Sequence, residues 1–214
     1  MKPRTRRWVQ RALLRLRSIE AEAGEIRHGD PAAQLLGSVG PGTRIEAPQL
    51  FLGNPSSVHF GANTYVRSGL RIEALAPPGG KIITVGDEGQ FGYDIRLVAV
   101  NGIHIGNGVG IGHGATIADT IHEYKTGRRD EAPWKAPLKV GRPLTIEDHV
   151  WVGNNCVLTG GITIGKGSII NANSVISRDV PPHTIVSGNP PHIQKQLSDE
   201  GTWEWTIDPA ELEL

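Results

Sequence analysis

One histidine, His122, stands where the chain leaves an otherwise regular pattern and enters a polar, proline-bearing stretch over residues 123–142. Irregular segments of this length are usually functional or disordered. A neutral imidazole has a pKa suited to taking a proton from a weak nucleophile and returning it to a leaving group. Asp119, three residues earlier, could orient such an imidazole, although a plain turn aspartate fits equally well. These residues are the first candidates for chemistry.

The lone cysteine of the chain, Cys156, is a weaker candidate. A catalytic thiol needs to face solvent near a base, whereas a buried cysteine behaves as a small apolar filler. Cys156 falls at a repeat position that we expect to point inward. One cysteine in 214 residues excludes a disulfide framework, and this fits a reducing compartment.

The elements that position these residues follow from a six-residue repeat. Two series recur at this spacing, and neither a helical period nor two-residue alternation produces them. The first is aliphatic and the second is apolar or small; they comprise Ile146, Val152, Leu158, Ile164, Ile170 and Ile176, then Val150, Cys156, Ile162, Ser168, Ser174 and Val180. Short strands that cannot bury a face alone must stack as coils. The pattern predicts a parallel β-helix.

The same register appears upstream, so the repeat spans roughly residues 40–186 with insertions. Ile105, Ile111 and Ile117 are spaced by six, and Val109, Ala115 and Ile121 follow in the second inward position. The next certain repeat begins only at Ile146, 29 residues after Ile117. This gap predicts one long loop that projects from the β-helix, with His122 at its root.

Charge is distributed unevenly although the formal net charge is zero. Residues 1–17 hold seven Lys or Arg and no acid, whereas residues 199–214 hold six acids and no base. Apolar residues at helical spacing in the first segment predict a basic amphipathic helix. It could cap the open end of the β-helix or attach loosely to an anionic membrane surface. No other basic patch or aromatic platform supports nucleic-acid binding.

We therefore expect an all-β protein in three parts. Residues 1–39 form the short amphipathic α-helix and a connector, 40–195 form the β-helix with the loop at 123–142, and 196–214 form an acidic tail. No apolar stretch is long enough to span a membrane and no signal-peptide core follows the first charges. We expect a soluble, cytoplasmic protein that could be peripheral to the inner face of the membrane.

Several strings, taken in order, resemble a known family. They are IGNGVGIG (105–112), IADTIHEY (117–124), RPLTI (142–146), HVWVG (149–153), SVISRDVPP (174–182) and SGNPP (187–191). Together they look like the hexapeptide-repeat sugar O-acetyltransferases, nearest to polysaccharide or capsule types and to galactoside and maltose types. The resemblance implies a left-handed β-helix, a homotrimer with active sites between subunits, and acetyl-CoA as donor.

The resemblance also implies roles for individual residues. His122 matches the catalytic general base that activates a sugar hydroxyl, with Asp119 beside it, and Tyr124 and Asp94 are expected to contact the acceptor. The positions expected to contact the cofactor are Trp151, Asn154, Ala172, Ser177, Arg178 and Lys195. Several family positions differ here, among them Gly92, where galactoside-type members place an acceptor-binding Asn, and this leaves the acceptor sugar open.

Two other functions fit a β-helix. A non-catalytic scaffold is one. The other is a zinc enzyme like the gamma-class carbonic anhydrases, because His104, His113 and His122 are spaced by nine, half of an 18-residue coil. The His-x4-His pair typical of that class is absent, so we expect no metal.

Overall fold

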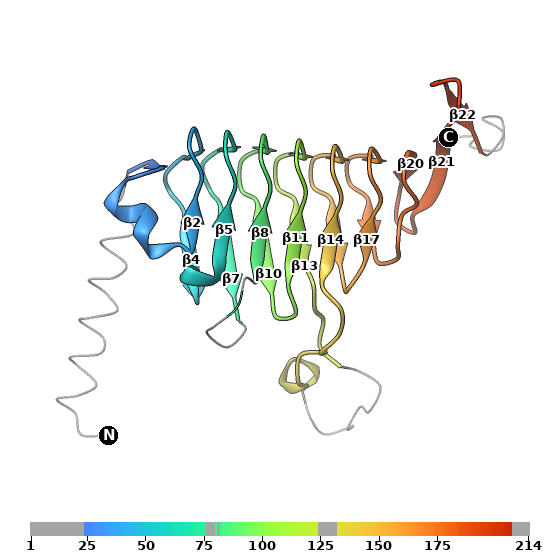
Figure 1. Cartoon of the computed structure of the whole chain (residues 1–214). Helices are drawn as coiled ribbons and strands as arrows, with labels where there is room; N and C mark the ends of the chain where they lie inside the picture. The colour runs from blue at the N-terminus through green and yellow to red at the C-terminus, as the bar shows by residue number, and fades with distance from the viewer. Residues whose placement is uncertain (1–23, 76–79, 81, 124–131, 207–214) are drawn as a thin grey trace.

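The computed structural model describes residues 24–75, 80, 82–123 and 132–206. Its strands stack in six coils of three strands each, and this forms a straight parallel β-helix (Figure 1). The predicted fold class is confirmed. The predicted N-terminal helix lies outside the described residues.

Each coil contributes one strand to each of three sheets. The β14 sheet contains β2 (Ser38–Val39), β5 (Val58–Phe60), β8 (Ile83–Val85), β11 (Ile103–Ile105), β14 (Leu144–Ile146) and β17 (Thr163–Ile164). The β13 sheet contains β4 (Leu50–Gly53), β7 (Arg71–Ala74), β10 (Arg96–Ala99), β13 (Thr116–Ala118), β16 (Val157–Thr159) and β19 (Val175–Ile176). Strands of the same sheet pair in parallel register.

The third sheet, the long sheet, extends past the coils at both ends. It contains β1 (Ile26–Arg27), β3 (Arg44–Ile45), β6 (Tyr65–Val66), β9 (Gln90–Phe91), β12 (Gly110–Ile111), β15 (Trp151–Val152), β18 (Ile169–Ile170), β20 (Thr184–Ser187), β21 (His192–Leu197) and β22 (Trp203–Trp205). Antiparallel β1 covers the first coil, and antiparallel β21 and β22 form a hairpin beyond the last. The expected domain boundary at residue 195 therefore falls inside β21.

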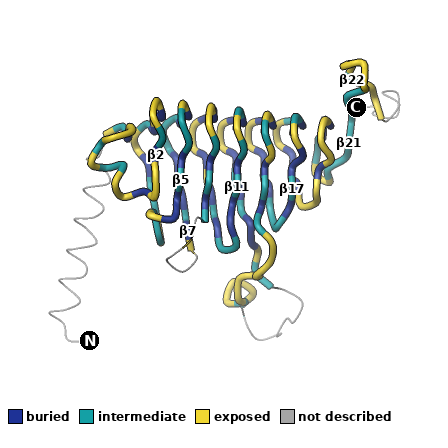
Figure 2. The backbone as a smooth tube through the Cα atoms, viewed as in Figure 1, coloured by how far each residue is buried: buried dark blue, intermediate teal, exposed yellow. Residues whose placement is uncertain are grey.

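The core is a single apolar column along the axis, and Figure 2 shows the buried strands between exposed corners. All twelve residues of the two predicted series from Ile146 to Val180 are buried, and Cys156 among them is fully covered. Burial raises the pKa of its thiol. The filler interpretation of Cys156 is confirmed.

One inward position was predicted wrongly, because Ile121 is 44% exposed. The chain leaves the coil at Asp119, so Ile121 already belongs to the loop and not to a strand of the repeat. Within the described ranges, three short 3-10 helices interrupt the strands, namely η1 (Pro31–Leu35), η2 (Pro55–Ser57) and η3 (Pro133–Lys135), and η3 lies within the loop.

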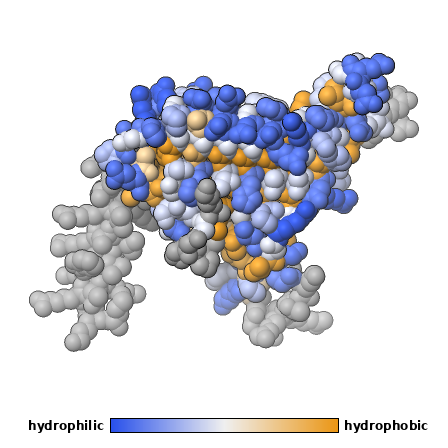
Figure 3. All heavy atoms as spheres, in the orientation of Figure 1, coloured by the Kyte–Doolittle hydropathy of each residue, from blue (hydrophilic) through white to orange (hydrophobic). Residues whose placement is uncertain are grey.

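Three rows of corners join the sheets. We call them the Asp148 corner, between the β14 and long sheets, the Asn154 corner, between the long and β13 sheets, and the loop corner, between the β13 and β14 sheets. Hydrophilic residues line the upper rim of the molecule in Figure 3, which the Asp148 corners form.

Side chains cap the corners of neighbouring coils. At the Asp148 corner, backbone N–H groups donate to side-chain oxygens one coil later, from Ala62 to Asp87 (2.6 Å), from Asp87 to Asn107 (2.8 Å) and from Asn107 to Asp148 (2.7 Å). At the Asn154 corner, the N–H of Tyr93 donates to Nδ1 of His113, and that of His113 donates to Oδ1 of Asn154, both at 2.9 Å. Each such bond gives an acceptor to a backbone N–H group of a corner that has no partner in a neighbouring strand.

Candidate functional site

The long loop leaves the loop corner through a short antiparallel neck, visible below β13 and β14 in Figure 1. The N–H of Lys139 donates to the carbonyl of Ile121 at 2.8 Å, and the N–H of Glu123 donates to the carbonyl of Pro137 at 2.9 Å. His122 lies between them and pairs with Leu138. The neck fixes the backbone on both sides of the predicted catalytic residue.

The His122 ring is held by the returning strand of the neck. Its Nδ1 atom lies 2.6 Å from the carbonyl oxygen of Ala136, and the contact is partly buried. A carbonyl oxygen can only accept, so Nδ1 must carry the hydrogen, and in the neutral ring the lone pair is then on Nε2. This tautomer is the one required of a base that acts through Nε2.

His113 differs in this respect. Its Nδ1 accepts a hydrogen bond from the N–H of Tyr93, so in the neutral ring Nε2 carries the proton. The two histidines therefore present opposite tautomers, and only His122 combines a basic Nε2 with a position in the loop neck.

Asp119 does not take the predicted orienting role, because backbone donors surround its buried carboxylate. The N–H groups of Asn101 and Val100 donate to it at 2.6 and 2.9 Å, and that of Gly102 donates as well. These residues form the turn that inserts extra chain after β10. The orienting role predicted for Asp119 is therefore wrong, since Asp119 caps this turn and the carbonyl of Ala136 orients His122.

Asn101 and Thr120 connect that turn to the loop. The N–H of Gly141 donates to Oδ1 of Asn101 at 2.9 Å, and Oγ1 of Thr120 donates to the carbonyl of Lys139 at 2.9 Å. The turn that Asp119 caps is thus hydrogen-bonded through Asn101 to the returning end of the loop.

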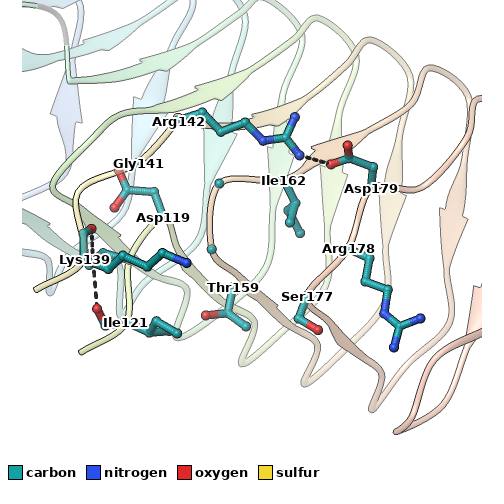
Figure 4. A pocket seen from close by; sticks show the side chains of 13 residues that line it. Asp119, Ile121, Lys139, Gly141, Arg142, Thr159, Ile162, Ser177, Arg178 and Asp179 are labelled. Atoms are coloured by element: carbon teal, nitrogen blue, oxygen red, sulfur yellow. Dashed lines mark hydrogen bonds and ion pairs between the residues drawn. The ribbon is translucent and has the colours of Figure 1, made fainter. Parts of the chain in front are cut away.

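A pocket of about 420 Å³ opens at the loop corner beside the neck (Figure 4). It brings together three residues predicted from the sequence, Asp119, Ser177 and Arg178. The sequence analysis missed two cations of its lining, Lys139 and Arg142, which come from the returning end of the loop. These two residues follow an irregular stretch and fit no repeat. The only sign of their role in the sequence is their position just before the repeat resumes at Ile146.

An ion pair closes one side of this pocket. Arg142 donates to Oδ1 of Asp179 at 2.5 Å, and the N–H of Thr163 donates to the same oxygen at 2.8 Å. The hydrogen bond from Thr163 and, after it, the nearby guanidinium lower the pKa of Asp179. Lys139 has its ammonium group toward the pocket in Figure 4, so the pocket can receive an anionic group.

Trp151 lies on the outer face of the long sheet and is 50% exposed, because it immediately precedes the inward-facing Val152. Its partner in the preceding coil is Gly110, and a Cβ atom at that position would overlap the indole ring. Gly110 therefore leaves the space in which the indole lies flat against the sheet. In the following coil its partner is the half-buried Ile169.

Three predicted residues share the Asn154 corner. Asn154 and Ala172 are exposed and lie in successive coils, and the backbone of Ala172 approaches Gly153 so closely that a Cβ there would overlap it. Asp94 is also exposed and has a φ of 57° in the corner of an earlier coil. This corner is therefore an open surface with tightly packed backbone beneath it.

Lys195 lies in the C-terminal hairpin, where its ammonium nitrogen is 4.2 Å from the ring centre of Trp205. Tyr124 lies outside the described residues. In one chain the predicted residues thus do not form a single group. His122, Asp119, Ser177 and Arg178 lie at the loop corner, whereas Trp151 lies on the long sheet, which this corner does not touch.

The three histidines spaced by nine lie at different places on the coil. His104 lies on the outer face of β11 with its Nδ1 2.9 Å from Thr84, His113 lies at the Asn154 corner, and His122 lies in the loop neck. Among the residues that the structure describes, no group of three or more potential metal ligands is close enough to hold an ion. Within the same residues, no helix is both long and apolar enough to cross a membrane.

Comparisons with known proteins agree with this architecture. Residues 143–178 match the bacterial transferase hexapeptide family, described by six repeats. The chain is 24% identical over 166 residues to the galactoside O-acetyltransferase of Escherichia coli, which is 78% of this chain and 66% of the relative. It is 28% identical over 159 residues to a provisionally named lipopolysaccharide biosynthesis O-acetyl transferase of the same organism, which is 72% of this chain and 80% of the relative.

A solved structure is also similar. The hexapeptide-repeat acetyltransferase of Vibrio cholerae in complex with acetyl-CoA superposes with a TM-score of 0.54 at 27% identity, over 86% of this chain and 85% of that one. The chain spans 66% of the length of the galactoside enzyme, and 50% and 56% of two other curated relatives. In its strand register and its matched repeats, the chain is similar to the hexapeptide-repeat acetyltransferases.

Proposed function

We propose that this protein is an O-acetyltransferase that moves the acetyl group of acetyl-CoA to a sugar hydroxyl, with His122 as general base. The observation that carries the proposal is the 2.6 Å contact between Nδ1 of His122 and the carbonyl of Ala136, which sets the tautomer of a base. The likeness to an acetyltransferase that binds acetyl-CoA supports the choice of donor.

In the proposed reaction, Nε2 of His122 takes the proton of the acceptor hydroxyl as its oxygen attacks the thioester carbonyl carbon. The bond between that carbon and sulfur then breaks, and the imidazolium returns the proton to the departing thiolate. The carbonyl of Ala136 keeps its hydrogen bond throughout and stabilises the charged ring. Donors to the developing oxyanion would come from backbone N–H groups.

A complete site requires a second copy of the chain, and we propose a homotrimer. Two features support it. His122 and Trp151 lie on separate sides of one β-helix, and the loop exposes large apolar side chains, with Trp134 at 70% and Val140 at 83% exposure. Ile121 and Leu138 of the neck are exposed as well, and several exposed apolar side chains in one segment are typical of an interaction surface. We propose that the loop of one subunit packs beside the long sheet or the Asn154 corner of its neighbour.

Mixing two impaired variants tests this arrangement, at an acetyl-CoA concentration well below the raised Kd of Trp151→Ala. If each site combines His122 of one subunit with Trp151 of another, co-refolding His122→Ala with Trp151→Ala restores activity, because some sites receive both intact residues. Two copies of the same variant, refolded in the same way, are the control. Light scattering first checks that each variant is trimeric. If the mixed trimers then recover no activity, His122 and Trp151 of the same subunit belong to one site.

We propose a glycan as the acceptor class, because the named relatives include a galactoside O-acetyltransferase and a lipopolysaccharide biosynthesis protein. The test is release of the CoA thiol in the presence of a panel of sugars, with His122→Ala as the blank. Release that depends on a sugar and on His122 supports the proposal. Release without any sugar, or equal release by the variant, contradicts it.

We further propose a cytoplasmic enzyme at the inner face of the membrane, on the basis of the seven cations in residues 1–17. Deleting these residues should lower co-sedimentation with vesicles that contain phosphatidylserine and leave binding to neutral vesicles unchanged. Equal sedimentation of the full chain and the truncated chain would contradict membrane attachment.

A further inference from the structure

Five planar side chains stack along the outside of the β-helix from the first coil to the fourth. They begin on the long sheet and end at the Asn154 corner, and we call them the planar column: Arg44, Tyr65, Arg67, Tyr93 and His113. The guanidinium carbon of Arg67 lies 5.5 Å from the ring centre of Tyr65 and 5.1 Å from that of Tyr93. Tyr93 in turn stacks on His113, with ring centres 5.1 Å apart and planes inclined by 23°.

The column is fixed by hydrogen bonds as well as by stacking. Arg67 donates to the hydroxyl of Tyr93 at 2.9 Å, and the hydroxyl of Tyr65 donates to Glu46. Arg44 continues the column at the other end, 5.5 Å from the ring centre of Tyr65. The planar groups are therefore held in place before any ligand arrives, which reduces the entropy lost on binding.

The apolar core lies on the inner side of these strands, so the column is not needed to fill it. Tyr93 is 40% exposed, and Arg44 and His113 are exposed. Cation–π contacts at exposed sites stabilise a fold only slightly. Arg67 makes no ion pair with any carboxylate among the described residues, so no ion pair there neutralises its charge.

Stacking covers the faces of these groups and leaves their edges. Arg44, Tyr65 and Arg67 each already donate one hydrogen bond at their edges, to Glu25, Glu46 and Tyr93. The other guanidinium N–H groups, the lone pairs of the phenol oxygens and Nε2 of His113 can bond sugar hydroxyls. The column crosses three steps between coils, and at roughly 4.8 Å per step it extends over roughly 14 Å. One sugar ring cannot contact so long a row, but a chain of linked sugars can.

The column leads toward the proposed site. Its last member, His113, donates its backbone N–H to Asn154, which lies in the next coil and on the same corner as Ala172. We infer that the planar column is an acceptor track, along which an oligosaccharide or polysaccharide lies while its reacting unit reaches the acetyl group. This inference rests on the proposed function and adds that the acceptor is a sugar chain and not a single sugar.

Acetyl transfer to sugars of graded length tests the track. The probes are three series of one to six units, galactose with its β-1,4 oligomers, glucose with the malto-oligosaccharides, and N-acetylglucosamine with the chito-oligosaccharides. In the series that the enzyme acetylates, we expect kcat/KM to rise about tenfold or more from one unit to three, the gain that one or two additional hydrogen bonds provide.

Arg67→Ala removes the central member of the column. It should abolish the rise of kcat/KM with length, so that its loss relative to the wild type grows with each added sugar unit. Arg96→Ala is the matched control, because it removes another arginine from the outside of the β-helix. Arg96 is exposed, makes an ion pair with Glu73 at 2.6 Å and lies on the β13 sheet, outside the column. It should keep the full length dependence.

The outcomes separate the track from the proposed function. A kcat/KM that does not rise with length in the wild type, or an Arg67→Ala variant that loses activity equally on all lengths, overturns the track and leaves sugar acetylation intact. Absence of transfer to every probe, with acetyl-CoA bound, contradicts the proposed function, and the track falls with it.

Discussion

Nδ1 of His122 and the carbonyl oxygen of Ala136 are 2.6 Å apart, although fourteen residues separate them in the chain. The returning strand of the loop therefore determines which nitrogen of the His122 ring carries the hydrogen. A histidine oriented by a backbone carbonyl needs no carboxylate partner to present a basic Nε2. This relationship leads to the first two predictions.

His122→Ala should lower kcat for acetyl transfer by ~10²–10⁴-fold, since a positioned base contributes about that much. Thermal unfolding should be unchanged, because the side chain is outside the core. His104→Ala, on the outer face of β11, is the control and should retain activity. Near-normal turnover by His122→Ala would remove this residue as the base.

Asp119→Ala should act on stability first. The substitution leaves the N–H groups of Val100, Asn101 and Gly102 without their acceptor, at a cost on the order of 3 kcal/mol in the free energy of unfolding. Urea unfolding measures this loss, and Asp199→Ala, at an exposed position, should show none. A variant of unchanged stability that has lost its activity would instead restore the orienting role for Asp119.

Gly110→Ala should weaken acetyl-CoA binding as much as Trp151→Ala does, by ~10-fold in Kd if the indole covers the ligand. The added Cβ would overlap the indole of Trp151 and push it off the sheet. Calorimetry with both variants checks this prediction. Gly80→Ala serves as the control because nothing lies near its added methyl group. Unchanged affinity in Gly110→Ala would mean that the flat indole has no part in binding.

Acid sensitivity should depend on Glu25 at the first coil. Hydrogen bonds from Arg44 and then from Arg27 lower the pKa of Glu25 from 4.5 to about 2. A carboxyl group with a lowered pKa in the folded state contributes stability above pH 4.5 and loses it as the pH falls toward 2. The pairs are near the surface, so the contribution should be about 1 kcal/mol or less.

Glu25→Gln should therefore unfold at a lower temperature than the wild type at pH 7, and the two melting curves should converge between pH 4.5 and pH 2. Raising the salt concentration should narrow the difference at pH 7, because it screens exposed charges. Parallel curves over the whole acid range would show that this ion pair does not contribute to stability.

The sequence predicted the β-helix well because its core obeys a fixed period. Val152 and Ile170 face inward for the same reason as every other member of their series. Trp151 could be placed outside because it immediately precedes an inward position. Ile121 was misplaced because it keeps the spacing of the repeat although the chain has already left the coil at Asp119. Periodicity alone does not reveal where a coil ends.

The candidate site was less predictable because it depends on contacts that have no period. Asp119 was three residues from His122 in sequence, but its partners are the N–H groups of a turn almost twenty residues earlier. Lys139 and Arg142 reach the pocket only because the loop neck closes. The planar column combines residues from four coils, and no short sequence motif contains more than one pair of them.

The corner caps bind each coil to both of its neighbours. Asp148 accepts from the N–H of Asn107 in the coil before it, whereas Glu147 of the same corner accepts from the N–H of Lys166 in the coil after it. At the Asn154 corners, Asn154 likewise accepts from the coil before it, and Glu46 accepts from the N–H of Ser68 in the coil after it. Removing a coil from either end would thus leave unpaired N–H groups in the coil next to it, so an inner coil becomes complete only when both of its neighbours are in place.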